Sequence, residues 1–158
     1  MWYKFKVYTV SVLIAVGAGL LSSALTQMNM DIYPELVKPP LSPPALLFPI
    51  VWTVLYILMG ISSAMIYLKM KEELIASQNA LALYGANLII NFTWSIIFFG
   101  FGKYLFAFIW LVFLLFTVIR MIISFEKLSK VAAYLQIPYA VWVIFAGYLN
   151  FAIWLINK

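Results

Sequence analysis

Charged residues in this chain occur only between long apolar stretches. Five stretches contain no Asp, Glu, Lys or Arg: residues 7–27, 45–68, 74–102, 104–119 and 131–157. A helix needs about 20 apolar residues to cross the hydrocarbon core of a bilayer, and four stretches are long enough. The fourth in chain order reaches that length if its helix continues past Arg120, whose long side chain can extend to the interface. The pattern predicts membrane helices over about 5–27, 45–69, 74–101, 104–126 and 130–156.

The composition indicates one membrane domain. Hydrophobic residues make up 66% of the 158 residues and charged residues 9%, whereas about a quarter of residues are charged in ordinary soluble domains. The predicted helices leave no room for a separate soluble domain, so residues 1–158 are expected to form a single all-α integral membrane domain, a five-transmembrane-helix bundle. A cleavable signal peptide is the alternative for the first stretch, but its apolar run exceeds the usual 7–15 residues or so.

Lysine and arginine are unevenly distributed over the two sides of the predicted bundle. The N-terminus and the second and fourth loops carry Lys4, Lys6, Lys69, Lys71, Arg120, Lys127 and Lys130. The other side carries Lys38, Lys103 and Lys158. Because cytoplasmic loops are enriched in these residues, the sequence predicts a multi-pass protein of the cell membrane with a cytoplasmic N-terminus. The scatter of basic residues over helix ends argues against a nucleic-acid partner and indicates contact with the lipid bilayer.

Missing residue types exclude several kinds of chemistry. The chain has no cysteine and no histidine, which excludes disulfides, thiol nucleophiles and thiolate metal sites and removes the commonest general base. We therefore expect no metal and no cofactor. The acidic residues all lie in predicted loops, at Asp31, Glu35, Glu72, Glu73 and Glu126. An ion-coupled pump, which needs ionisable groups within the membrane, is disfavoured for the same reason.

Three predicted helices carry aromatic or polar residues on one face. The stripes are Phe48, Trp52, Tyr56 and Met59 in the second helix, Asn87, Asn91, Trp94 and Phe98 in the third, and Trp142, Ala146, Leu149 and Ile153 in the fifth, with Tyr139 and Asn150 beside the last. An asparagine in hydrocarbon needs a hydrogen-bond partner, so the three asparagines are expected to face the bundle interior. Two interpretations stay open for Trp52 and Trp142: filling of the core, or a ligand site.

Three motifs, in order along the chain, closely resemble those of the translocator protein family. This family is also called TspO/MBR, the tryptophan-rich sensory proteins or the peripheral benzodiazepine receptors. The motifs are the passage from Lys38-Pro39 through Pro43-Pro44 to Phe48-Pro49-Ile50-Val51-Trp52-Thr53-Val54-Leu55-Tyr56, the run Asn91-Phe92-Thr93-Trp94-Ser95-Ile96-Ile97-Phe98-Phe99, and Pro138-Tyr139-Ala140-Val141-Trp142 with Leu149-Asn150. The resemblance covers essentially the whole chain and is to a bacterial-type member.

The resemblance implies a ligand pocket under the first loop. It implies a membrane receptor or carrier that binds porphyrin-type ligands, related flat apolar molecules and benzodiazepine-type drugs. The corresponding pocket positions are Tyr33, Pro43, Pro44, Trp52, Tyr56, Asn87, Asn91, Trp94, Phe99, Trp142, Ala146, Leu149 and Asn150. The chain departs from the family at Ile32 and Leu41, where tryptophan is common, and at Asn87, where glutamine is usual. The two missing tryptophans weaken the case for porphyrin stacking at the loop.

Two other functions remain open. One is an enzyme that catalyses the light-dependent oxidative breakdown of protoporphyrin, for which Trp52 and Trp142 are the candidate catalytic residues. Such a reaction needs no acid–base pair, so the residues that the chain lacks do not exclude it. The other is a membrane protein with a sensory or regulatory role.

Assembly and ligand access also leave traces in the sequence. Ala15, Gly19 and Ser23 follow one another at intervals of four residues, which lets helices approach closely in lipid. Together with the resemblance, this ridge predicts a homodimer, although the ridge can equally pack inside the bundle. Prolines between residues 39 and 44 stiffen the first loop, so we expect it to act as a lid, with Tyr33 covering the ligand.

Overall fold

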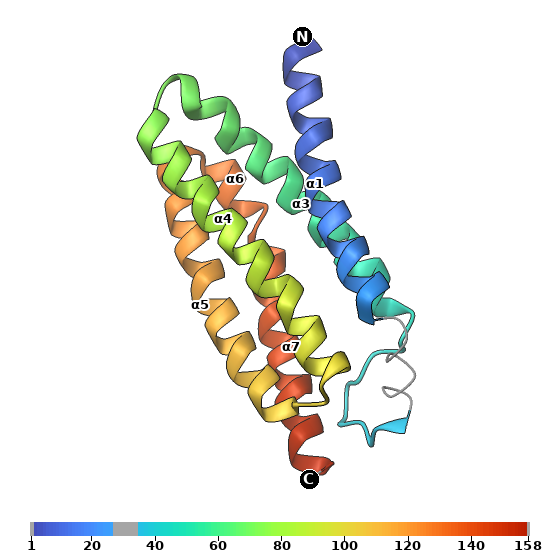
Figure 1. The fold of residues 1–158 in the computed structure, drawn as a ribbon. Coiled ribbons are helices and arrows are strands. Elements are labelled where there is room, and N and C mark those ends of the chain that lie inside the picture. The colour runs from blue at the N-terminus through green and yellow to red at the C-terminus, as the bar shows by residue number, and fades with distance from the viewer. Residues whose placement is uncertain (1, 27–34, 158) are drawn as a thin grey trace.

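The protein is a bundle of long helices, and the computed structural model describes its residues 2–26 and 35–157 (Figure 1). The helices are α1 (Trp2–Thr26), α3 (Leu47–Leu68), α4 (Leu74–Ser95), α5 (Tyr104–Leu128), α6 (Lys130–Tyr134) and α7 (Ile137–Ile156). Two short helical segments, the 3₁₀ turn η2 (Lys69–Lys71) and the π-helical segment η3 (Ile96–Gly100), extend α3 and α4. Among the described residues, five helical spans are long and apolar enough to cross a membrane. The predicted five-helix all-α membrane bundle is confirmed.

Arg120 lies inside a helix and not at its end. α5 runs without a break from Tyr104 to Leu128, and Arg120 lies on its exposed side. The exposed position allows the guanidinium to reach a polar environment while Met121, the next residue, is fully buried. The fourth apolar stretch therefore gains its membrane-spanning length in the way that the sequence predicts.

The helix predicted over 130–156 is interrupted near its start. α6 ends at Tyr134, and α7 begins at Ile137 after a short turn. Pro138 explains the break, because proline has no backbone N–H and its ring would clash with the carbonyl four residues earlier in a continuous helix. In the observed structure Pro138 lies in the first turn of α7, where no intrahelical N–H bond is required.

The start of α3 is also set by proline. The turn before it is closed by hydrogen bonds from Leu47 N to Pro44 O (2.9 Å) and from Phe48 N to Ala45 O (3.3 Å). Pro49 follows in the first turn of α3, where its missing N–H costs nothing. The Pro-rich passage thus ends in a helix that carries Phe48 and Trp52 into the bundle.

α1 and α3 approach each other closely at small residues. A Cβ atom built on Gly60 would lie 2.5 Å from the Cα of Val12, so only glycine fits there without a backbone shift. Ala15 is fully buried, and Gly19 faces the ring of Tyr56. Two members of the small-residue ridge of α1 therefore pack inside the bundle, whereas Ser23 is exposed.

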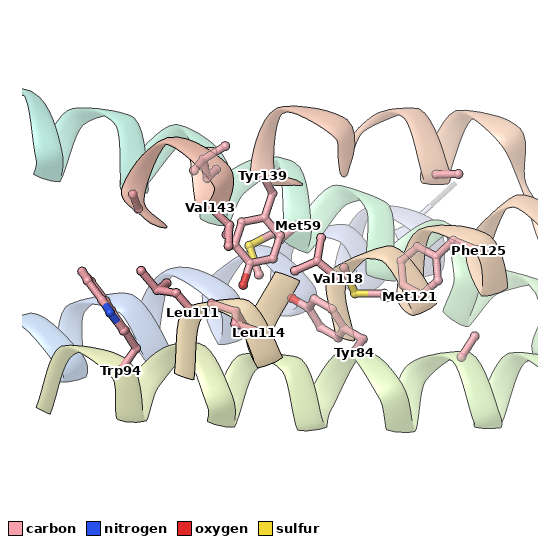
Figure 2. Close-up of a cluster of buried hydrophobic side chains, with 14 of the residues drawn as sticks. Met59, Tyr84, Trp94, Leu111, Leu114, Val118, Met121, Phe125, Tyr139 and Val143 are labelled. Atoms are coloured by element: carbon pink, nitrogen blue, oxygen red, sulfur yellow. The ribbon is translucent and has the colours of Figure 1, made fainter. Parts of the chain in front are cut away.

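One half of the bundle is densely packed, as Figure 2 shows. We call it the packed half; its buried side chains include Met59, Tyr84, Leu114, Val118, Met121, Phe125, Tyr139 and Val143. Figure 2 shows the rings of Tyr84 and Tyr139 turned toward the same interior region from opposite helices. Large side chains from α3, α4, α5 and α7 therefore fill this part of the interior.

A hydrogen-bonded polar group lies within the packed half. Asn87 is fully buried; its Nδ2 donates to Thr117 Oγ1 (2.9 Å), and its Oδ1 accepts from Tyr139 Oη (3.0 Å). Thr117 Oγ1 in turn donates to Leu114 O (2.7 Å). Buried polar groups are tolerated in a membrane when they are bonded in this way. Asn87 therefore links α4, α5 and α7.

Candidate ligand cavity

The other half of the bundle contains a cavity of about 240 Å³. α1, α3, α4, η3 and α7 form its walls near the end of the bundle that carries the first loop. The lining residues are Val16, Gly19, Leu20, Ser22, Ser23, Thr26, Ala45, Phe48, Pro49, Trp52, Thr53, Tyr56, Asn91, Trp94, Ser95, Phe98, Phe99, Ala146, Leu149, Asn150 and Ile153. None of these residues is charged, and most of the wall is apolar. We call the part of the bundle lined by these residues the cavity half.

Three side chains make the most distinctive part of the wall. The rings of Trp52 and Tyr56, one turn apart on α3, lie 5.7 Å apart between centroids. Asn91 of α4 donates from Nδ2 to Tyr56 Oη at 3.0 Å. Within the described residues, no protein group donates to Asn91 Oδ1, and Tyr56 Oη donates to none. The cavity wall thus offers one hydrogen-bond acceptor and one donor beside an aromatic face.

Asn150 has a different part in the same wall. Its Oδ1 accepts from Trp94 Nε1 (3.3 Å), and its Nδ2 donates to Tyr104 O (3.0 Å). The amide is therefore committed to protein partners from α4 and the start of α5. It fixes the indole of Trp94 against Phe98 and Phe99, whose ring centroids lie 5.5 and 6.2 Å from that of Trp94.

The backbone beyond Trp94 changes from α-helix to the π-helical segment η3. The α-helix ends at Ser95, and Phe98 and Phe99 both line the cavity although they are adjacent in the sequence. Their rings stand at 73° to each other with centroids 4.8 Å apart. Single π-helical turns are frequent at functional sites, and here the segment supplies two neighbouring aromatic rings to one wall.

The cavity reaches the outer surface of the bundle between α1 and α3. Leu20 and Ser23 of α1 and Pro49 and Thr53 of α3 line it and are nevertheless exposed. These residues lie within membrane-spanning helices. The surface that they share therefore faces lipid, and the opening is flanked by apolar or uncharged side chains.

Several of the residues expected at the site from the sequence lie together in the cavity wall. They are Trp52, Tyr56, Asn91, Trp94, Phe99, Ala146, Leu149 and Asn150. Their spacing on three helices was the signal that indicated them. Because α3, α4 and α7 turn these faces inward at the same end of the bundle, the separate stripes meet around one space.

Other expected site residues lie elsewhere. Asn87 is one turn from Asn91 and belongs to the hydrogen-bonded group of the packed half. Trp142 packs against Phe48, with ring centroids 6.0 Å apart, and its buried Nε1 has no hydrogen-bond partner within the described residues. Pro43 and Pro44 do not line the cavity. Tyr33 lies outside the described residues.

The contribution of α1 was not expected from the sequence. Gly19, Ser22 and Thr26 line the cavity along the second half of this helix, and Ser22 Oγ lies 3.4 Å from Phe92 O of α4. Their small size, which we interpreted only as a helix-packing signal, also leaves space beside the large aromatic residues of α3. Nothing in the local pattern distinguishes these two roles.

Electrostatic interactions are confined to the end of the bundle away from the cavity. Lys69 Nζ and Glu72 Oε2 are 2.7 Å apart in the exposed turn between α3 and α4. The hydrogen bond and the charge of Lys69 lower the pKa of Glu72 below its ordinary value. Within the described residues, no group of three or more acidic, histidine or cysteine residues could hold a metal ion. The cavity can therefore recognise a ligand through shape, aromatic contact and hydrogen bonds.

Comparisons with known proteins agree with the motifs. Residues 10–155 match the model of the TspO/MBR family. The chain is 38% identical over 128 residues to a tryptophan-rich protein TspO of Chlorobaculum tepidum, covering 79% of this chain and 78% of the relative. It is 36% identical over 126 residues to protein CrtK of Rhodobacter capsulatus, with 79% and 78% covered. It is 32% identical over 130 residues to a translocator protein of Bos taurus, with 80% and 75% covered.

Proposed function

This chain belongs to the TspO/MBR family, and we propose that its cavity half binds porphyrin-type ligands and related flat apolar molecules. The observation that carries the proposal is the pairing of an aromatic wall with a donor and an acceptor that no protein group uses, at Trp52, Tyr56 and Asn91. Ligand sites commonly combine apolar walls with a few convergent polar groups. In this proposal the chain acts as a membrane receptor or carrier, and the membrane is the source of the ligand.

The size of the cavity constrains how such a ligand is bound. Typical small-molecule pockets have volumes of about 300–1,000 Å³, and this cavity has about 240 Å³. A tetrapyrrole would place one edge between Trp52 and Asn91 and extend toward the lipid-facing opening beside Leu20 and Thr53. The apolar macrocycle would then lie partly in protein and partly in the bilayer, where both environments favour it.

A titration with metal-free protoporphyrin tests the proposal. Wild-type protein in lipid nanodiscs should change the absorbance of the pigment saturably, at one molecule per chain. Asn91→Leu, which removes the acceptor and the partner of Tyr56, should weaken binding by about tenfold, equivalent to about 1.4 kcal/mol. Asn79→Leu is the matched control, because Asn79 is exposed on the same helix. Equal affinities of Asn91→Leu and Asn79→Leu would contradict the proposed site.

A second candidate function is supported by the aromatic contacts of Trp52. Its ring lies 5.7 Å from that of Tyr56 and 6.2 Å from that of Tyr139. Adjacent oxidisable rings at a ligand site fit the alternative of light-dependent oxidative breakdown of protoporphyrin. Spectra of bound pigment in light and in darkness, with dioxygen present, distinguish the two functions. A carrier leaves the pigment intact beyond its uncatalysed bleaching, whereas an enzyme consumes it faster, and Trp52→Phe slows that excess.

We propose further that the N-terminus is cytoplasmic in the cell membrane. Lys69, Lys71 and Lys130 lie at the same end of the bundle as the N-terminus of α1, and Lys103 lies at the other end. The enrichment of basic residues on the cytoplasmic side supports this orientation. Because the chain has no cysteine, the variants Lys71→Cys and Lys103→Cys each give a single label site. Only Lys103→Cys should react with an impermeant thiol reagent from outside intact cells.

The proposed homodimer needs a surface other than the buried part of the α1 ridge. Ala15 and Gly19 face α3 within the same chain, so they are not available to a second copy. The exposed apolar side chains of α5, which include Val112, Phe116 and Ile119, form an alternative face. Disulfide crosslinking of Val112→Cys and Phe116→Cys in native membranes should trap a dimer through this face, with Leu13→Cys on α1 as the comparison.

A further inference from the structure

The first loop is fastened to the last residues of α7 by a pair of hydrogen bonds. Val37 N donates to Asn157 Oδ1 (3.0 Å), and Asn157 Nδ2 donates to Val37 O (2.9 Å). The side-chain amide of Asn157 thus pairs with both backbone groups of one loop residue, as a neighbouring peptide group would. Asn157 Nδ2 also donates to Ile153 O (2.9 Å), one turn back, and this bond fixes the amide at the end of its own helix.

A second attachment lies three residues further along the loop. Tyr148 of α7 donates from Oη to Pro40 O at 2.9 Å. Pro39 is buried, and Leu36 packs against the hydrophobic core. The described part of the loop is therefore attached to α7 at both Val37 and Pro40. Since Pro39 and Pro40 have restricted backbones, two attachments suffice to fix the course of this segment.

The attachments connect two walls of the cavity. Ile153, whose carbonyl holds Asn157, lines the cavity on α7. After Pro40 the loop continues into Ala45, Phe48 and Pro49, which line the cavity at the start of α3. Within the described residues, α3 and α7 contact each other in the cavity half through large aromatic side chains, such as Phe48 with Trp142. The loop attachments are thus a direct hydrogen-bonded link between these two walls.

We propose that Asn157 and Tyr148 are positioning residues that hold the first loop on α7 and thereby set the rate at which a ligand enters and leaves the cavity. Neither residue lines the cavity, so they would act on the rates of exchange and little on the affinity. The rate-setting role rests on the proposed function, because it requires a ligand, whereas the fastening of the loop does not. The ligand class is the flat apolar molecule of that proposal.

Hydrogen exchange of the ligand-free protein in lipid nanodiscs tests the fastening. Backbone amides in exposed loops exchange fast unless a hydrogen bond protects them, and Val37 N–H is protected by Asn157 alone. The double variant Asn157→Ala, Tyr148→Phe should speed exchange in peptides covering 35–44 by on the order of tenfold. The matched control is Asn79→Ala, Tyr134→Phe, which changes exposed side chains that make no hydrogen bond within the described residues. Unchanged exchange at 35–44, or equal acceleration in α3 and α4, would overturn the proposal.

Stopped-flow binding of metal-free protoporphyrin tests the rate-setting role. The double variant should raise the association and dissociation rates together, each by about tenfold, with the dissociation constant changed less than about threefold. Faster loop exchange with wild-type binding rates would overturn this role. If wild-type protein binds no protoporphyrin, the proposed function fails, and the hydrogen-exchange result still decides whether Asn157 and Tyr148 hold the loop.

Discussion

Asn87 and Asn91 stand one turn apart on the same helix, yet the packed half and the cavity half use them differently. Both amide atoms of Asn87 are bonded to protein groups, from Thr117 and Tyr139, and the side chain is fully buried. Asn91 has one bond, to Tyr56, and its oxygen remains available at the cavity wall. The difference comes from the neighbours, since large side chains surround Asn87 whereas small residues of α1 leave space near Asn91. A buried asparagine indicates a site only where its partners leave it incomplete.

The largest expected effect is a loss of stability on removing the amide from the packed half. Asn87→Leu leaves the hydroxyl of Tyr139 without its acceptor and should lower the free energy of unfolding by about 2–3 kcal/mol. Asn91→Leu should lower it by less than about 1 kcal/mol, because Tyr56 Oη can bond to water or ligand in the cavity. Denaturant unfolding in detergent measures both. An equal loss in the two variants would contradict the distinction between the halves.

Glycines of the two halves should respond differently to an added methyl group. In Gly60→Ala the new Cβ meets the backbone of Val12, which cannot move alone, so we expect a loss of about 1–3 kcal/mol. In Gly19→Ala the new Cβ meets only the ring of Tyr56, which can turn into the cavity. This variant should unfold nearly as wild type does and bind protoporphyrin more weakly. Gly17→Ala, with no atom within 4 Å of the new Cβ, is the control and should not be destabilised.

The two central tryptophans should separate in binding. Trp52 lines the cavity, whereas Trp142 packs behind Phe48. Trp52→Phe should weaken protoporphyrin binding by about 1–2 kcal/mol through lost aromatic area and a lost N–H donor. Trp142→Phe, which we also predicted from the sequence to contact ligand, should now cost less than about half of that. Matching losses would place Trp142 at the ligand after all.

The smallest expected effect concerns the metal. Because the chain has neither histidine nor cysteine, the commonest strong axial ligands of haem iron are missing from both halves. Metal-free protoporphyrin and haem should therefore bind to the cavity with affinities within about tenfold of each other, as measured by parallel titrations. A haem preference of a hundredfold or more would show that another group of the chain coordinates iron.

The sequence predicts the fold well because charge and hydropathy act over whole helices. The sites of Trp52 and Asn91 could also be predicted, because residues at intervals of three or four share a helix face. The periodicity cannot tell Asn91 from Asn87, or Trp52 from Trp142, since each pair depends on the size of side chains from other helices. The pairing of Asn157 with Val37 joins residues 120 positions apart, and no local pattern announces it. Contacts of this kind are decided by tertiary packing alone.

The structure of this protein with metal-free protoporphyrin bound in a lipid environment tests the central claim most directly. We predict that one edge of the macrocycle lies between Trp52 and Asn91, with the rest directed toward the opening between α1 and α3 and the packed half unchanged. A pigment seated on the outer surface of the bundle, or between two copies of the chain with the cavity empty, would contradict the assignment of the cavity half as the ligand site.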